Sequence, residues 1–329
     1  MTLVIDAYVP FIVEAVQNEW PDVDICSLKP EQIDADAVQD ADALIVRTRT
    51  KVDEQLLAGS KVRLVCTATI GFDHIDTAYC DSHNISWISC PGCNAQAVCD
   101  YIEEAINTIT NHPYLQIVPT GKESPITNTP TLGVVGVGHV GSRVAKMAER
   151  RGMKVLLNDP PKGIGVSLDA IAQNCDIITF HVPLDMSTYH LCDEAFLAKC
   201  KPGALIINAA RGGVVDEQAL LRSGHPYILD TWENEPDINP DVLQKALLAS
   251  MHIAGYSVEG KRNASQRCLD EIAQTFGLPP IDIAQYRYNG ITGTRKNSSE
   301  PWLAAITRQL KESPTAFEAL RKAYPLREG

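Results

Sequence analysis

The stretch Gly136-Val137-Gly138-His139-Val140-Gly141 decides the fold. It follows an apolar run, Thr131–Val135, and opens an amphipathic segment, Val140–Arg151, so this Gly-x-Gly-x-x-Gly pattern lies at a predicted strand-to-helix turn. The first glycine permits a tight turn, the second lets a pyrophosphate approach the backbone, and the third permits close packing of helix on strand. N–H groups at the helix start would hold the anion. The stretch predicts a dinucleotide-binding α/β domain, with binding residues Gly136, Gly138, His139, Val140 and Gly141.

Asp159 ends the next predicted strand, 18 residues after Gly141. An acid at this place accepts hydrogen bonds from the adenine-ribose hydroxyls and repels a 2′-phosphate, which selects NAD over NADP. The alternative is that Asp159 only starts the turn before Pro160-Pro161. We predict NAD as the cofactor.

Composition narrows the class of protein. The 329 residues carry 29 Lys+Arg and 41 Asp+Glu, a net charge of −12, which argues against non-specific binding to nucleic acid or anionic membranes. A few local arginines could still hold a small anionic substrate. No apolar run approaches the roughly 20 residues of a membrane span, and no signal peptide is visible. Ten scattered cysteines are typical of reduced thiols. We therefore expect a cytoplasmic globular protein.

Short apolar runs alternate with helix-sized segments along most of the chain, which predicts parallel sheets built from strand–helix–strand units. The long helix predicted over 94–111 would join two domains. Beyond it, about six strands fit a doubly wound parallel (Rossmann) sheet. The runs read as strands are Leu3–Ile5, Val23–Ile25, Ala43–Val46, Arg63–Cys66, Ile85–Ile88, Thr131–Val135, Lys154–Leu157, Asp176–Phe180, Ala204–Asn208, Tyr227–Asp230 and a last one at His252.

Three polar stretches follow predicted strands, where open α/β sheets place their ligands. They are Asn208–Asp216, Asp230–Pro236 and His252–Tyr256. Histidine has an ordinary pKa of about 6.5, which suits proton exchange near neutrality, so we predict that His252 is the base. Glu235 would orient its imidazole, and Arg211 would grip a carboxylate with its planar fork of donors. The alternative is a structural histidine before a glycine turn, with Glu235 in a simple Glu-Pro turn.

Together these motifs resemble the D-isomer-specific 2-hydroxyacid dehydrogenases over residues 1 to about 280. The resemblance implies an α/β fold with an NAD domain over 97–256 and a smaller flavodoxin-like substrate (lid) domain over 1–96 and 257–280. It also implies that a short C-terminal region, 281–329, forms a homodimer. At the nicotinamide end it implies contacts from Ala209, Ala210, Arg211, Asp230 and Gly255. Val182 stands where relatives often have Thr, so a cofactor contact there would use backbone or apolar surface.

Within this family, several stretches resemble the erythronate-4-phosphate dehydrogenases. They are Val4–Ala7, Val46–Val52, Thr67–His74, Pro91–Asn94, Ile253–Lys261 and Phe317–Pro325. This resemblance implies oxidation of 4-phospho-D-erythronate to (R)-3-hydroxy-2-oxo-4-phosphonooxybutanoate, a step toward pyridoxal 5′-phosphate. It places Thr48, Thr69 and Tyr256 on the substrate. Arg47 is our candidate for the substrate phosphate, with Arg321 as a second.

The sequence also fits other functions. The chain could be another D-2-hydroxyacid dehydrogenase, of the 3-phosphoglycerate or hydroxypyruvate type, or an NAD-sensing interaction protein with the same fold. Cys90 and Cys93 have the spacing of a redox or zinc pair, but they lie within a family-like turn. Asp73, His74 and Asp76 resemble a helix start more than a metal cluster. We expect no metal, no nucleic acid and no membrane partner.

Overall fold

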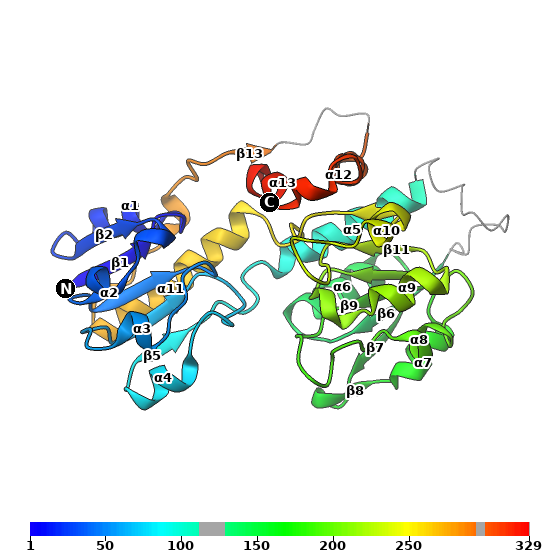
Figure 1. Ribbon diagram of the computed structural model, residues 1–329, viewed down its shortest axis with the longest axis horizontal. Coiled ribbons are helices and arrows are strands. Elements are labelled where there is room, and N and C mark those ends of the chain that lie inside the picture. Colours follow the sequence, from blue (N-terminus) through cyan, green and yellow to red (C-terminus); the bar gives the residue numbers. More distant parts are fainter. Residues whose placement is uncertain (112–128, 294–299, 329) are drawn as a thin grey trace. The chain divides into compact units, whose positions relative to one another are not determined.

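The computed structural model describes residues 1–111, 129–293 and 300–328 (Figure 1). The chain divides into two compact units. Unit 1 comprises Met1–Asn94, Tyr256–Thr292 and Leu326–Gly329, and unit 2 comprises Ala95–Gly255 and Gly293–Pro325. Part of the stretch predicted for the NAD domain, 112–128, lies outside the described residues. So do residues 294–299 of the predicted C-terminal region.

Unit 1 contains a five-stranded parallel sheet in the order β2-β1-β3-β4-β5. This is the flavodoxin-like order, and it confirms the predicted class of the smaller domain. The topological switch lies between β1 and β3, so their carboxyl ends, at Asp6 and Val46, are where a ligand would bind. The strands are β1 (Thr2–Asp6), β2 (Asp24–Leu28), β3 (Ala43–Val46), β4 (Leu64–Thr67) and β5 (Ser86–Ile88).

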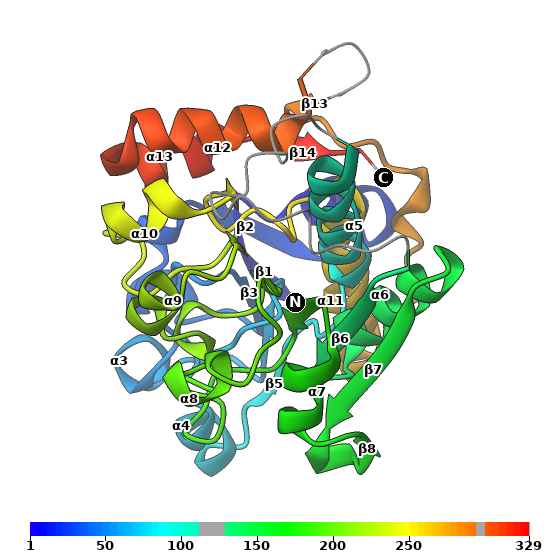
Figure 2. The ribbon, with the colours of Figure 1, turned by 90° about the vertical axis from the view of Figure 1, so that its right-hand side faces the viewer.

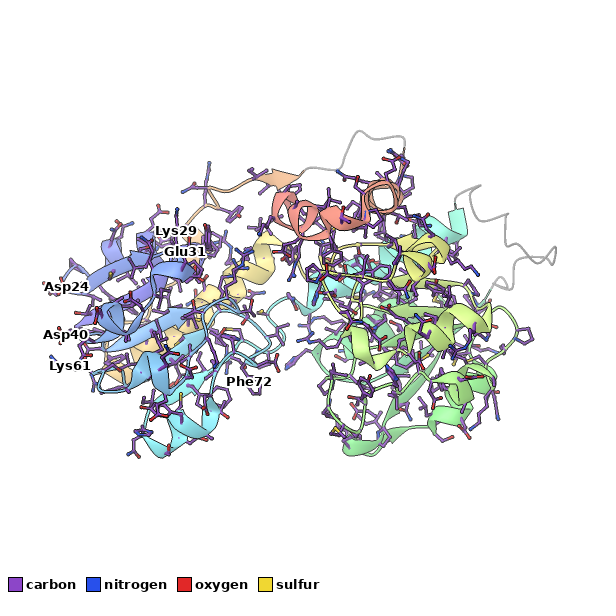
Figure 3. The ribbon with its side chains drawn as sticks, in the orientation of Figure 1. Asp24, Lys29, Glu31, Asp40, Lys61 and Phe72 are labelled. Atoms are coloured by element: carbon purple, nitrogen blue, oxygen red, sulfur yellow. The ribbon has the colours of Figure 1, made fainter. Side chains whose placement is uncertain are left out.

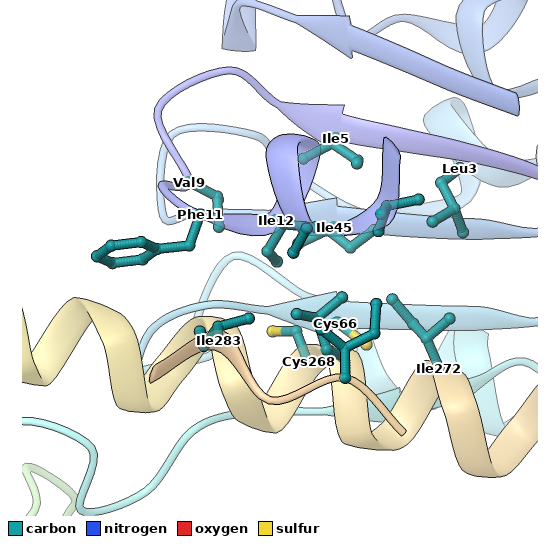
Figure 4. Close-up of a cluster of buried hydrophobic side chains, with 14 of the residues drawn as sticks. Leu3, Ile5, Val9, Phe11, Ile12, Ile45, Cys66, Cys268, Ile272 and Ile283 are labelled. Atoms are coloured by element: carbon teal, nitrogen blue, oxygen red, sulfur yellow. The ribbon is translucent and has the colours of Figure 1, made fainter. Parts of the chain in front are cut away.

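Strand β3 explains why its sequence is an unbroken apolar run. Ala43 and Ile45 pack into the core under helices α1 (Ile12–Glu19) and α11 (Val258–Phe276), while Leu44 and Val46 pack into a second core on the opposite face. Because both faces of the strand are covered, its sequence does not alternate between apolar and polar residues. Figure 4 shows the first core, with Ile5 and Ile45 from the sheet near Ile12 of α1 and Ile272 of α11.

The second face of this sheet is covered by three short helices, α2 (Ala35–Val38), α3 (Glu54–Leu57) and α4 (Thr77–Ser82). An aspartate caps the start of each, because Asp34, Asp53 and Asp76 accept backbone N–H groups of the first turn. Charged side chains such as Asp40 and Lys61 point outward from unit 1 (Figure 3), and these two form an exposed ion pair of 2.8 Å.

Unit 2 contains a seven-stranded sheet in the order β12-β11-β10-β9-β6-β7-β8. Six strands are parallel, and the two-residue β8 pairs antiparallel with β7. The order confirms the predicted doubly wound sheet, with its switch between β6 and β9. The strands are β6 (Thr131–Val135), β7 (Lys154–Asp159), β8 (Ile164–Gly165), β9 (Ile177–Phe180), β10 (Leu205–Asn208), β11 (Tyr227–Leu229) and β12 (Leu248–Ala249).

One face of this sheet packs against α5 (Ala95–Asn111), α6 (His139–Arg150) and α12 (Trp302–Glu312), which share a core with β6, β9 and β10. Figure 2 shows α12 lying beside α10, and Gln244 of α10 donates to the carbonyl of Lys311 of α12. The remaining helices of unit 2 are α7 (Leu168–Asn174), α8 (Glu194–Leu197), α9 (Glu217–Ser223), α10 (Pro240–Lys245) and α13 (Phe317–Ala323). Short 3-10 turns cover Pro30–Gln32, Pro160–Lys162, Gly212–Val214, Ile283–Gln285 and Pro314–Ala316.

Two features differ from the sequence-based expectations. The last strand of the sheet is β12, and His252 lies three residues beyond its end with a left-handed φ of 57°. Residues 281–329 are divided between the units: residues 281–292 and 326–329 belong to unit 1, and Gly293–Pro325, with α12 and α13, belong to unit 2. Two short strands of this region, β13 (Thr292–Gly293) and β14 (Leu326–Arg327), pair with each other. Within the described ranges, no helix is long and apolar enough to span a membrane.

Candidate active site

The glycine-rich turn has the geometry that its sequence predicts. Gly136 has a φ of 90°, and a Cβ there would approach the His181 carbonyl carbon and oxygen to 2.7 Å. A Cβ on Gly141 would lie 1.9 Å from the Gly136 oxygen, so the helix packs against the turn only with glycine there. Gly138, the N-cap of α6, faces open space, where a Cβ would meet only Lys162 Nζ, at 4.0 Å. The first-turn N–H groups of α6 therefore have room for a phosphate.

Asp159 lies at the end of β7, beside this turn. Its Oδ2 accepts a hydrogen bond from Val137 N at 2.8 Å and lies 3.3 Å from Lys162 Nζ. Burial alone would raise the pKa of Asp159, but the Val137 N–H and the charge of Lys162 lower it overall. Lys162 also donates to the Val137 carbonyl at 2.8 Å. Sequence reasoning missed Lys162; the signal was a cation three residues after the predicted ribose-binding acid.

A cavity of about 510 Å³ in unit 2 brings together the three predicted catalytic side chains, Arg211, Glu235 and His252. They come from the segments that follow β10, β11 and β12. The other lining residues are Leu184, Tyr189, His190, Gly212, Gly213, Asp216, Gln218, Trp232, Glu233 and Asn234. Stretches more than 40 residues apart in sequence thus meet at the carboxyl edge of one sheet.

Glu235 and His252 form a hydrogen-bonded pair. His252 Nδ1 lies 2.9 Å from Glu235 Oε2, and Glu235 Oε1 accepts from Trp232 N at 2.9 Å. Burial would raise the pKa of Glu235, but the hydrogen bond and charge of His252, with smaller contributions from the Trp232 N–H and the Arg321 charge, lower it overall. The carboxylate is therefore ionised near neutrality.

Arg211 projects into the same cavity from a loop that passes close to the Glu235 segment. A Cβ on the next residue, Gly212, would lie 1.9 Å from the Trp232 carbonyl oxygen, so glycine is required for this approach. Asn208 fastens the loop by donating to the Arg211 carbonyl at 2.8 Å and accepting from Ala210 N at 3.1 Å. The half-buried Arg211 donates to the Ala210 carbonyl through Nη1. Its other guanidinium N–H groups suit a carboxylate ligand.

Asp230 is buried and braces the His252 segment. One carboxylate oxygen accepts from Ser250 Oγ at 2.6 Å and Ile253 N at 2.8 Å, and the other accepts from Ala254 N at 2.9 Å. The Asp230 carbonyl also accepts from His252 N at 2.8 Å. This role in positioning His252 was not expected from the sequence. Ala209, Ala210, Val182 and Gly255 are partly exposed at the ends of β10, β9 and the His252 segment.

A second set of polar side chains beside the cavity was also missed. His190 Nε2 lies 2.5 Å from Glu233 Oε1, and the buried Glu217 accepts from Glu233 N at 2.8 Å. These contacts hold both the side chain and the backbone of Glu233, two residues before Glu235. Burial raises the pKa of Glu217 to about 7, although the Glu233 N–H opposes the shift.

The predicted substrate residues Arg47, Thr48, Thr69 and Tyr256 lie in unit 1. Arg47 and Thr48 follow β3 at the switch point, with Arg47 half-buried and Thr48 exposed. Lys261 lies in the first turn of α11. Burial and the positive charge of Arg47 lower the pKa of Lys261 to about 8, against the opposing charge of Asp6. Arg321, our second phosphate candidate, instead lies in unit 2, where its charge acts on Glu235.

The weaker sequence signals have structural explanations. Asp76 caps α4 through Tyr79 N, as a helix start requires. All ten cysteines are free thiols, and burial raises the pKa of Cys93 to about 12, which disfavours the reactive thiolate. Among the described residues, no group of three or more His, Cys, Asp or Glu side chains is arranged to hold a metal ion.

Known proteins resemble this chain in sequence over most of its length. The D-isomer specific 2-hydroxyacid dehydrogenase, NAD binding domain, matches residues 102–254. The erythronate-4-phosphate dehydrogenase of Bacteroides fragilis is 40% identical, over 99% of this chain and 97% of its own. The Porphyromonas gingivalis enzyme of the same name is 38% identical, over 99% and 92%. The chain belongs to the erythronate-4-phosphate dehydrogenase family. It is an NAD-dependent dehydrogenase of the 2-hydroxyacid class, as the sequence predicted.

Solved structures of this class share the fold. D-lactate dehydrogenase from Aquifex aeolicus, complexed with NAD and lactic acid, superposes with a TM-score of 0.66 at 25% identity, over 84% of this chain and 96% of that one. NAD-bound 3-phosphoglycerate dehydrogenase from Entamoeba histolytica gives 0.68 at 26%, over 84% and 95%. The Klebsiella pneumoniae erythronate-4-phosphate dehydrogenase is matched over only 74% of its length.

Proposed function

We propose that this protein oxidises 4-phospho-D-erythronate at carbon 2 and produces (R)-3-hydroxy-2-oxo-4-phosphonooxybutanoate, a step toward pyridoxal 5′-phosphate. The observation that supports this most strongly is the convergence of Arg211, Glu235 and His252 on one cavity, at the carboxyl edge of the sheet whose strand β6 leads into the glycine-rich turn. The 2-hydroxyacid reaction needs a carboxylate clamp, a base for the hydroxyl proton and a hydride acceptor. The named relatives point to the phosphorylated four-carbon acid.

The proposed roles follow from side-chain chemistry. Arg211 binds the substrate carboxylate through its free N–H groups. His252 takes the proton of the carbon-2 hydroxyl at Nε2, because Nδ1 is engaged by Glu235. Glu235 stabilises the imidazolium that forms. NAD, when bound, supplies the hydride acceptor. The N–H groups of the first turn of α6 hold its pyrophosphate, Asp159 accepts from its ribose hydroxyls, and Asp230 keeps the His252 segment in place.

In unit 1 we assign the substrate phosphate to Arg47 and Lys261. Two neighbouring cations at the carboxyl end of a parallel sheet suit a group that carries nearly two negative charges near neutrality. Among the described residues, neither side chain has an ion-pair partner within 4.0 Å, so both remain available to an anion. Thr48, Thr69 and Tyr256 would supply further substrate contacts.

We also propose that the protein acts in the cytoplasm as a homodimer. The ten free thiols favour a reducing compartment. The family resemblance of α13 to a dimerisation segment supports self-association through the C-terminal region. Sedimentation equilibrium would give the mass of the species in solution. A particle of 35.9 kDa at micromolar concentration would refute the dimer.

The test of function is NADH formation from 4-phospho-D-erythronate, 3-phosphoglycerate and D-lactate under one set of conditions. We expect the first compound to have the highest kcat/KM. A preference for 3-phosphoglycerate would assign the chain to the second type of dehydrogenase. NAD binding without turnover of any of the three would support an NAD-sensing protein instead.

A further inference from the structure

A chain of three hydrogen bonds runs within unit 1 from His74, through Thr67 and Thr69, to the carbonyl of Gly71. His74 Nε2 lies 3.0 Å from Thr67 Oγ1, and Thr67 Oγ1 lies 2.6 Å from Thr69 Oγ1. Thr69 Oγ1 donates to the carbonyl of Gly71 at 3.0 Å. Thr67 is fully buried at the end of β4, and Thr69 is partly exposed just beyond it. The chain therefore runs from a half-buried imidazole, through the core, to a surface hydroxyl.

The direction of every bond in this chain is determined. A carbonyl oxygen can only accept, so the Thr69 proton goes to Gly71. Thr69 must then accept from Thr67, which uses the single Thr67 proton. Thr67 in turn must accept from His74, so Nε2 carries a hydrogen. Burial lowers the pKa of His74, which keeps the ring neutral, and a neutral imidazole has only this one N–H.

Among the residues that the structure describes, Thr69 Oγ1 has only these two partners, so it is left with one unused lone pair and no unused proton. It can accept a hydrogen bond from a ligand but cannot donate one, so it does not suit a phosphate or carboxylate oxygen. A ligand hydroxyl matches it. In the substrate proposed above, the carbon-2 hydroxyl is assigned to His252, and the remaining hydroxyl is on carbon 3. 3-Phosphoglycerate and D-lactate have no free hydroxyl at that carbon.

We propose that His74 is a positioning residue that acts through Thr67 to fix Thr69 as a hydrogen-bond acceptor, and that Thr69 selects substrates with a hydroxyl at carbon 3. The second half of this proposal rests on the proposed function. The first half concerns the protein alone.

The first half is tested by nitrogen-15 NMR of the histidine rings in the unliganded full-length protein near neutral pH. We expect His74 to carry its hydrogen on Nε2. His83, in the same unit, is an internal control with the opposite tautomer, because its Nδ1 lies 2.9 Å from the Tyr79 carbonyl oxygen and must donate. An Nδ1-protonated His74 would overturn the relay, whatever the substrate.

The second half is tested with 4-phospho-D-erythronate and its 3-deoxy analogue, matched in configuration at carbon 2. We expect wild type to prefer the natural compound by roughly tenfold or more in kcat/KM, since the analogue leaves the acceptor unpaired. In Thr69→Val this preference should disappear, and in Thr69→Ser it should remain. His74→Gln, which keeps an N–H donor, should retain the preference that His74→Leu weakens.

The outcomes separate the two proposals. If wild type oxidises neither compound, the proposed function fails, while the tautomer measurement still decides the relay. If both compounds are used equally, or if Thr69→Val keeps the preference, Thr69 does not select the carbon-3 hydroxyl. If Thr69→Ser loses the preference together with Thr69→Val, a packing role replaces the hydrogen-bonding one.

Discussion

His252 Nδ1 and Glu235 Oε2 lie 2.9 Å apart, and the other oxygen of Glu235 is occupied by the Trp232 N–H. A carboxylate oxygen can only accept, so the hydrogen of the neutral His252 ring is on Nδ1. Nε2 then has a free lone pair. The contact thus sets the tautomer that a general base needs, and it does so before any substrate binds.

We expect His252→Ala to lower kcat for oxidation by about 10²–10⁴-fold, the usual contribution of an acid–base group. Binding of NADH, measured by fluorescence titration, should stay close to that of wild type, because the glycine-rich turn and Asp159 are untouched. Near-normal turnover would remove His252 from the mechanism.

Glu235→Gln should be more harmful than the loss of one charge suggests. The amide oxygen can still accept from Trp232 N, but the amide nitrogen then faces His252 Nδ1 and donates to it. That contact favours the Nε2-protonated tautomer, which cannot accept the substrate proton. We therefore expect a large fall in kcat, measured at saturating substrate and NAD. Wild-type turnover by Glu235→Gln would contradict the pairing.

Asp159→Ala should raise the NADP-to-NAD ratio of kcat/KM by roughly tenfold or more. The substitution removes the charge that repels a 2′-phosphate, and it frees Lys162 from the 3.3 Å ion pair to attract that phosphate. The double variant Asp159→Ala/Lys162→Ala should show a much smaller gain. Lys154→Ala, an exposed lysine at the start of the same strand, is the matched control. Equal ratios in the single and double variants would mean that Lys162 takes no part.

Glu217→Gln should stabilise the protein at neutral pH and above. Burial raises the pKa of Glu217 to about 7 in the folded chain, from an ordinary value near 4.5, so the folded state binds its proton more tightly than the unfolded state. Stability from this group is fully present below about pH 4.5 and is lost as the pH rises to about 7. The loss is roughly 3 kcal/mol at most. Glutamine keeps the acceptor for Glu233 N without the charge.

The check on Glu217 is urea unfolding of wild type and Glu217→Gln at several pH values. The difference in unfolding free energy should grow between pH 4.5 and pH 7 and then level off. Glu194→Gln, an exposed acid, provides the comparison. A difference that does not change with pH would show that Glu217 does not titrate in this range.

Arg47→Ala should reduce kcat/KM for 4-phospho-D-erythronate about tenfold to a hundredfold more than for unphosphorylated erythronate, because a charged hydrogen-bond partner of the phosphate is lost. Lys261→Met should likewise lower kcat/KM more for the phosphorylated compound than for unphosphorylated erythronate. Lys61→Ala, at an exposed ion pair of unit 1, is the control and should change neither compound. Equal losses on both substrates would show that Arg47 does not contact the phosphate.

The cofactor site could be predicted from the sequence because its determinants are local. Gly136 has a φ of 90°, which favours glycine, and a Cβ on Gly141 would lie 1.9 Å from the Gly136 oxygen. Both positions therefore require glycine, whatever surrounds them. The parallel sheets could also be predicted, because a strand covered on both faces, such as Ala43–Val46, is an unbroken apolar run in the sequence.

Tertiary structure alone decided the contacts between segments. Glu217 reaches Glu233 N, Asp230 braces Ile253 and Ala254, and His190 holds Glu233 across 43 residues. These partners meet because β9, β10, β11 and β12 end at one edge of a parallel sheet, and the number of residues between the partners follows no recognisable spacing. The sequence thus determined the residue types, the glycine-rich turn and the succession of strands and helices along the chain. Strand pairing and register determined which polar atoms face each other, because each hydrogen bond depends on distances below about 3.5 Å that no local pattern encodes.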